Sequence, residues 1–187
     1  MAETFSQAKF NTQVSAEKYV IPFLQHRWPH YQISTVEGLG ESLAMMLDMD
    51  TGADILVKDG ALSWLVASRI QLDKGHRTFS IRYLRDNGVR TEYSKRLEAM
   101  QNNAIRPRWN VHTYFKGDYA SIAIIESDPL IIYLHEQEKR GELKLKHTGY
   151  GQFGGATFCY ATWDELKAYT RVVEWSGNIN DLGAKYA

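Results

Sequence analysis

The sequence predicts a single α/β domain of the α+β type, with a mixed central sheet of about five to seven strands flanked by helices. The chain has 187 residues, a length that suits one domain. Alternating strands and amphipathic helices follow one another without an internal repeat or a low-complexity linker. Apolar residues make up 44% and charged residues 24%, close to the averages of globular proteins. We therefore expect an ordered core and flexible ends at residues 1–12 and 176–187.

Helical spacing and capping signals predict four helices, which cover residues 14–27, 91–104, 127–141 and 162–173. Pro22 predicts a kink in the first helix, or a later start. Ser127 or Asp128 is expected to cap the third helix. Thr162 and Glu165 have the capping-box spacing at the start of the fourth.

Seven segments have the alternation and composition of strands: 31–36, 53–58, 62–71, 77–84, 109–116, 119–127 and 156–161. The dipeptides Asp59-Gly60 and Gly117-Asp118 predict tight turns between neighbouring strands. The order of helices and strands favours a mixed or mostly antiparallel sheet with helices packed on it.

Composition excludes several classes of protein. The single cysteine, Cys159, cannot form an internal disulfide and lies in an apolar run typical of a buried strand. No apolar stretch reaches the roughly 18 residues that a bilayer requires, and the N-terminus does not have the pattern of a signal peptide. We expect a cytoplasmic protein with no membrane partner. The six histidines lack the cysteine partners or spacing of a zinc site, and residues 151–155 lack the lysine of a phosphate-binding loop.

Charge is unevenly distributed, although the formal net charge is zero. Residues 1–68 carry four basic and eight acidic side chains, a balance of −4. Residues 69–108 carry ten basic and four acidic side chains, a balance of +6. A basic middle beside an acidic first third is compatible with a phosphate-binding face next to a cation site, and also with ordinary solvated surfaces.

Three carboxylates are concentrated at the start of a predicted strand. Asp48, Asp50 and Asp54 fall within seven residues. Carboxylates that converge at a strand edge can hold Mg²⁺, or Mn²⁺ in its place, because these cations prefer oxygen ligands. A bound divalent cation can activate water for phosphodiester cleavage. The alternative is that the aspartates solvate a loop and a strand entry.

The segment around these carboxylates resembles the PD-(D/E)XK nuclease superfamily, in members from phage and mobile elements. A helix bearing Glu17 is followed by Asp54, which opens a strand, then by a short hairpin and a second strand with alternating polar residues. The resemblance implies that Asp54 is the metal-binding aspartate and Glu17 the helical glutamate of the metal site. Ala67 stands where the family has a metal-binding carboxylate or glutamine, and Arg69 stands where it has lysine.

These departures bear on catalysis. Arg69 can neutralise a phosphate but cannot act as a general base, because a guanidinium keeps its proton near neutral pH. Gln71 or Asp73 is a candidate for a displaced ligand. The candidate catalytic residues are therefore Asp54, Arg69 and Gln71, and the candidate metal ligands are Asp48, Asp50, Asp54 and Glu17.

A basic and aromatic stretch follows between residues 77 and 100. Basic side chains interleaved with tyrosines suit contacts to a phosphate backbone, and they equally suit a solvated helix face. The candidate nucleic-acid contacts are Arg82, Arg85, Arg90, Lys95 and Arg96.

Three functions are consistent with these patterns. The first is a nuclease-like domain that acts on DNA, an endonuclease or exonuclease whose hydrolysis depends on Mg²⁺. The second is a catalytically inactive protein of a mobile element that binds DNA or a protein partner on the same scaffold. The third is a small-molecule or structural domain without a nucleic-acid role.

Overall fold

The computed structural model describes residues 16–36, 51–71, 75–85, 87–148, 155–178 and 180–181. The helical elements are η1 (Ala16–Val20, a π-helical turn), α2 (Ile21–Arg27), α4 (Glu92–Gln101), α5 (Ser127–Arg140) and α6 (Trp163–Tyr169). The strands are β1 (Gln32–Thr35), β2 (Ile55–Asp59), β3 (Leu62–Gln71), β4 (Thr78–Arg85), β5 (Trp109–Lys116), β6 (Tyr119–Glu126), β7 (Lys144–Thr148), β8 (Ala156–Thr162) and β9 (Val172–Asn178).

A mixed central sheet dominates the described part of the chain, as the sequence predicts. Its six strands lie in the order β1-β2-β3-β5-β6-β9. Strands β3 and β5 are parallel, and every other neighbouring pair is antiparallel. The parallel pair requires a crossover, which runs through β4 and α4. Strands β4, β8 and β7 form a second, smaller antiparallel sheet.

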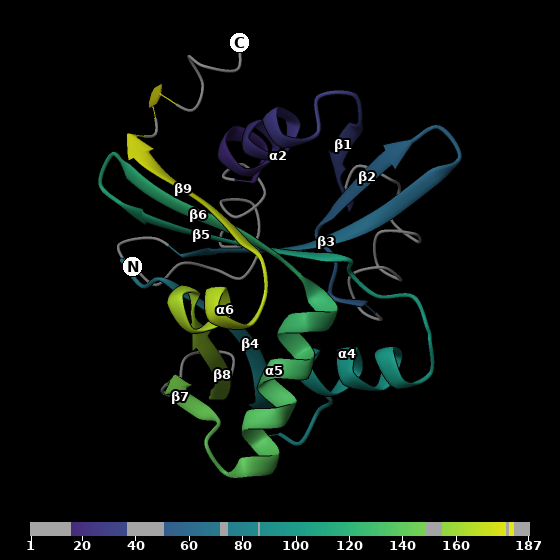
Figure 1. The fold of residues 1–187 in the computed structure, drawn as a ribbon, viewed down its shortest axis with the longest axis vertical. Helices are drawn as coiled ribbons and strands as arrows, with labels where there is room; N and C mark the ends of the chain where they lie inside the picture. Colours follow the sequence, from purple (N-terminus) through teal and green to yellow (C-terminus); the bar gives the residue numbers. More distant parts are fainter. Residues whose placement is uncertain are drawn as a thin grey trace.

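The two faces of the central sheet are covered by different elements (Figure 1). Helices η1 and α2 cover one face, where Leu24 packs in a cluster with Val57, Val66 and Ile122. Helices α4, α5 and α6 and the small sheet cover the other face, in a cluster that includes Phe79, Leu130 and Trp163. The sheet is therefore buried on both sides, which is why its inner strands are rich in apolar residues on both faces.

The β2–β3 hairpin fixes which side chains face which layer. Asp59 pairs with Leu62, so the loop contains only Gly60 and Ala61, and Gly60 adopts the left-handed conformation that this turn requires (φ 53°). Val66 and Ile70 of β3 pack on the α2 side. Because side chains alternate along a strand, residues 67, 69 and 71 share the opposite face of β3.

Helix boundaries agree with the predictions at some ends and differ at others. The Thr162–Glu165 capping box is present at the start of α6. Residue Pro22 falls in the first turn of α2, directly after the π-helical turn of η1. Neither Ser127 nor Asp128 caps α5, because the N-cap residue is Glu126. The Ser127 hydroxyl instead accepts a hydrogen bond from Asn110, and Asp128 pairs with Arg106.

Two strands were not predicted. Strand β7 is exposed at every position, so it lacks the apolar alternation that marks a strand. Strand β9 follows α6, which ends at Tyr169 rather than continuing to residue 173. Residues 176–178, the start of the end that the sequence predicts to be flexible, belong to β9 and pair with β6. Residues 1–12 and 182–187 lie outside the described residues. No helix in the described ranges is long and apolar enough to cross a membrane.

The packing of α2 on the sheet leads to a stability prediction. Leu24 is completely buried in the cluster between α2 and the sheet. We expect Leu24→Ala to lower the free energy of unfolding by about 2–5 kcal/mol, because it removes buried methyl groups and leaves a cavity. The control is Leu62→Ala, whose side chain is 67% exposed and which should change stability by no more than about 0.5 kcal/mol. Urea unfolding of both variants gives the comparison, and equal losses would contradict this packing.

Candidate functional site

A cavity of about 250 Å³ lies on the face of the central sheet opposite α2. It is formed by β3 and β5, by the segment that leads into β2, by β4 and by α4. Three arginines and two carboxylates therefore face one small space. The lining residues are Gly52, Asp54, Ala67, Ser68, Arg69, Ile70, Ser80, Arg82, Glu92, Arg96, Asn110 and His112.

Asp54 is held at the entrance to β2 by hydrogen bonds to β3. Its backbone N–H donates to the carbonyl of Val66 at 3.0 Å. The backbone N–H of Ser68 donates to Oδ2 of Asp54 at 2.6 Å. These two bonds extend the pairing of β2 with β3 by one residue beyond the ladder. They fix the Asp54 carboxylate beside Ala67 and Arg69.

Arg69 is the central cation of the cavity. Its guanidinium lies over the ring of Phe158, 4.2 Å from the ring centroid. Burial lowers the pKa of Arg69, while Glu92 raises it, and the neighbouring Arg82 and Arg96 lower it. Within the ranges that the structure describes, the guanidinium has no hydrogen bond and no ion pair. A largely buried cation in this situation favours an anionic ligand, because the anion would supply the missing partner.

Arg82 reaches the same cavity from β4. Its guanidinium lies 3.5 Å from a carboxylate oxygen of Glu92 and 5.7 Å from the centroid of the Phe158 ring. The side chain remains partly exposed, unlike that of Arg96. Arg82 can therefore meet a ligand that enters from solvent.

Arg96 is buried and mainly structural. It is 5% exposed, and its Nη1 donates to Oδ1 of Asn110 at 2.7 Å. Its Nη2 donates to the carbonyl of Gly52 at 3.2 Å. Asn110 in turn donates through Nδ2 to the hydroxyl of Ser127 at 2.7 Å. Arg96 therefore does not belong to a solvated helix face, and its positive charge acts on the cavity.

His112 lines the same cavity as the arginines and is buried in its neutral form. The backbone N–H of Ser80 donates to Nδ1 of His112 at 3.3 Å, so this nitrogen acts as an acceptor. Burial lowers the pKa of His112 well below 6.5, and the charges of Arg69 and Arg96 lower it further. Protonation of the ring is opposed by both causes, so this histidine adds no positive charge to the cavity.

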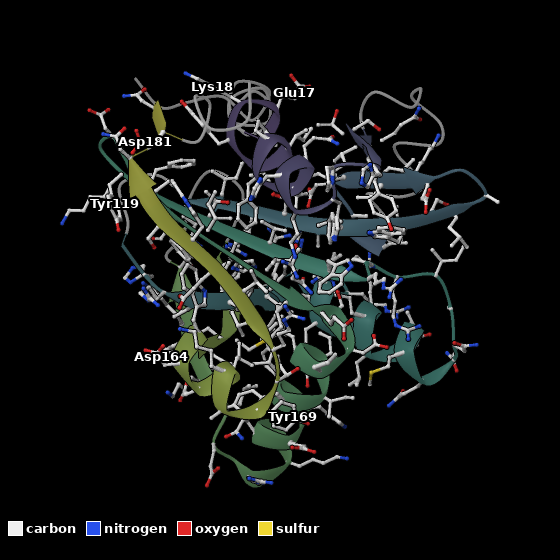
Figure 2. All side chains as sticks on the ribbon, turned by 45° about the horizontal axis from the view of Figure 1, so that its top comes forward. Glu17, Lys18, Tyr119, Asp164, Tyr169 and Asp181 are labelled. Atoms are coloured by element: carbon white, nitrogen blue, oxygen red, sulfur yellow. The ribbon has the colours of Figure 1, made fainter. Side chains whose placement is uncertain are left out.

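The remaining candidate metal ligands do not join Asp54 in the described residues. Glu17 is exposed on η1, and the buried Val20 of the same turn packs on the other face of the sheet. Figure 2 shows Glu17 at the outer surface beside η1. Gln71 lines a neighbouring cavity instead of this one. Asp48, Asp50 and Asp73 lie outside the described residues.

The basic residues predicted to contact nucleic acid separate into two groups. Arg82 and Arg96 line the cavity together with Arg69. Arg85 and Lys95 are not among its lining residues. Arg90 is exposed and forms an ion pair with Glu98 of α4. The predicted basic stretch is therefore not one continuous surface.

The donor set that the described residues bring to the cavity does not fit Mg²⁺ or Mn²⁺. No group of three or more histidine, cysteine, aspartate or glutamate side chains that could hold a metal ion occurs in the part of the chain that the structure describes. The second carboxylate of the cavity, Glu92, faces Arg82. Three arginines around two carboxylates favour an anion over a divalent cation.

Asn110, His112, Ser80 and Glu92 belong to the site but were not predicted from the sequence. The first two are polar residues at alternate positions of β5, a strand whose residues 110–115 are all buried. Polar side chains on the inner face of such a strand indicate a buried polar network, and this signal was available in the sequence.

Comparison with known proteins gives no relative: no family model, no curated protein and no solved structure matches the chain.

The environment of His112 predicts an acid-sensitive fold. The unfolded chain binds a proton to His112 near pH 6.5, whereas the folded chain does so only at lower pH. Stability is therefore present above about pH 6.5 and falls as the pH decreases, by at most about 1.4 kcal/mol per pH unit. We expect His112→Asn to flatten this slope between about pH 7.5 and 5.5 in urea unfolding. The control His147→Asn, on the exposed strand β7, should keep the wild-type slope of stability against pH. Equal slopes for wild type and His112→Asn would contradict the prediction.

Proposed function

We propose that this protein binds DNA and that Arg69 and Arg82 hold a backbone phosphate in the cavity beside Asp54. The observation that carries the proposal is the convergence of Arg69, Arg82 and Arg96, from three separate elements, on one cavity. Among the lining residues that the structure describes, two carboxylates, Asp54 and Glu92, stand against these three positive charges, which leaves a net charge of +1 (three minus two).

The chemistry of the arginines supports a phosphate as the ligand. A guanidinium presents several N–H donors in one plane, and this geometry matches the oxygens of a phosphate. Arg69 lacks a hydrogen-bonded partner within the described residues, and Arg82 is partly exposed. A phosphate oxygen entering between them would give both guanidinium groups an acceptor.

The position of the cavity also supports a nuclease-like scaffold without its usual chemistry. Asp54 opens β2, the hairpin follows, and Ala67 and Arg69 lie on the same side of β3 as the Asp54 carboxylate. This is the arrangement that the resemblance to PD-(D/E)XK nucleases implies. Ala67 offers no ligand atom and Arg69 no base, so the arrangement favours binding over hydrolysis.

Metal-dependent hydrolysis is the second candidate, because Asp54 occupies the position of the metal-binding aspartate in that resemblance. A metal site would need further carboxylates, and Asp48 and Asp50 are the candidates that the sequence offers. The two candidates differ in one measurable property, which is cleavage of DNA when Mg²⁺ or Mn²⁺ is supplied.

The phosphate site predicts a specific loss of DNA affinity. We expect Arg69→Gln or Arg82→Gln to weaken binding of fluorescein-labelled DNA by roughly 10- to 100-fold, because each removes a charged hydrogen-bond donor. Each should also reduce the slope of log affinity against log salt by about one. Fluorescence anisotropy over a range of salt concentrations measures both quantities.

Arg90→Gln is the matched control for these variants. Arg90 comes from the same basic stretch but pairs with Glu98 at the surface, away from the cavity lining. It should bind DNA with nearly the wild-type affinity. If Arg69→Gln and Arg90→Gln behave alike, the phosphate site is refuted. Binding of a protein partner without salt dependence would favour a protein-binding function on the same scaffold instead.

The cleavage test separates binding from hydrolysis. We expect wild-type protein to leave plasmid DNA intact in the presence of Mg²⁺ or Mn²⁺, because Ala67 and Arg69 replace the groups that the chemistry requires. Agarose electrophoresis of plasmid incubated with wild type and with Asp54→Asn gives the readout. Cleavage by wild type that is lost in Asp54→Asn would establish the metal-dependent nuclease and reject the inactive form.

A further inference from the structure

A second cavity, of about 450 Å³, adjoins the phosphate cavity. Arg69, Ile70 and Ser80 line both cavities, so a ligand held by Arg69 can extend from one into the other. The further lining comes from the end of β3, from His76 and from the small sheet. These residues are Gln71, His76, Thr78, Lys146, Thr148, Phe158 and Tyr160.

The small sheet presents a basic and aromatic face to this second cavity. Residues opposite one another on paired strands lie on the same face of a sheet. Ser80, Tyr160 and Lys144 form one such row across the three strands, and Arg82, Phe158 and Lys146 form the next. Cys159 and Ala161 point the other way, into the core. The outward face therefore combines rings with cations, which is the combination that binds single-stranded nucleic acid.

The two aromatic rings differ in what they can do. The Phe158 ring is 8% exposed, and the guanidinium groups of Arg69 and Arg82 already lie over it. Tyr160 is half-buried and lines the cavity wall. Tyr160 is thus the ring available to stack on a ligand.

Gln71 supplies a polar group on the same cavity. Its side-chain amide has two donor hydrogens and an acceptor oxygen, which suits the edge of a nucleobase. Within the described residues this amide has no hydrogen bond. By contrast, the Thr78 hydroxyl lies within hydrogen-bond distance of Tyr114, and the Thr148 hydroxyl donates to the carbonyl of Ala156.

We infer that the second cavity binds an unpaired nucleobase, stacked on Tyr160 and hydrogen-bonded by Gln71, next to the phosphate held by Arg69. The ligand is then a single strand, because a base inside a duplex is stacked and paired and cannot enter a cavity in the protein. This inference rests on the proposed phosphate site and names the class of nucleic acid that the site takes.

The test compares three labelled probes in fluorescence anisotropy: short oligo-dT, an abasic deoxyribose-phosphate chain of equal length, and a duplex of equal length. We expect oligo-dT to bind about tenfold more tightly than the abasic chain, a difference of about 1.4 kcal/mol. Tyr160→Ala should remove this difference, whereas Tyr160→Phe keeps the ring and should preserve it. DNA and RNA strands both offer phosphates and unpaired bases. The affinity for oligo-U, compared with that for oligo-dT, therefore tells which of the two strands the cavity prefers.

The outcomes separate this inference from the proposed function. If Arg69→Gln weakens all probes but oligo-dT binds no better than the abasic chain, the base cavity is refuted and the phosphate site stands. Duplex DNA that binds as tightly as oligo-dT would likewise refute the base cavity and leave the phosphate site standing. If Arg69→Gln leaves every probe unaffected, both are refuted. Thermal unfolding of Tyr160→Phe and Tyr160→Ala checks that a lost preference is not a lost fold.

Discussion

Arg96 is only 5% exposed between α4 and the central sheet, and its hydrogen bonds together with that of Asn110 join four segments. It donates to Asn110 on β5 and to the carbonyl of Gly52 before β2, and Asn110 donates to Ser127 at the start of α5. A buried guanidinium is tolerated only with such partners. The same bonds set the entrance of β2 against α4, so the cavity that contains Arg69 and Asp54 depends on them.

Much of the fold could be predicted from local patterns. Strands β3 and β5 follow from alternation and flanking turns, and α6 from its capping box. Strand β7 could not be predicted, because every one of its residues is exposed and it is held only by pairing with β8. Strand β9 was assigned partly to a helix, since its pairing with β6 is a long-range contact that no local pattern reveals.

The site was predictable in part. Side-chain alternation predicts that Arg69 shares a face of its strand with Ala67, and both line the cavity, as does Arg82 from the basic stretch. The sequence could not show that Arg96 is buried whereas Arg90 is exposed, because this depends on how α4 packs on the sheet. Glu17 carries a charge compatible with a metal site, but η1 packs on the other face of the sheet. Spacing along the chain does not determine which layer a helix joins.

A crystal structure of the protein with short oligo-dT would show whether the cavity beside Asp54 holds a phosphate of a nucleic-acid strand. We expect a backbone phosphate within hydrogen-bond distance of both Arg69 and Arg82, and no metal ion on Asp54 when Mg²⁺ is present. A strand bound elsewhere on the molecule, or a phosphate bridged to Asp54 by a metal ion, would contradict it.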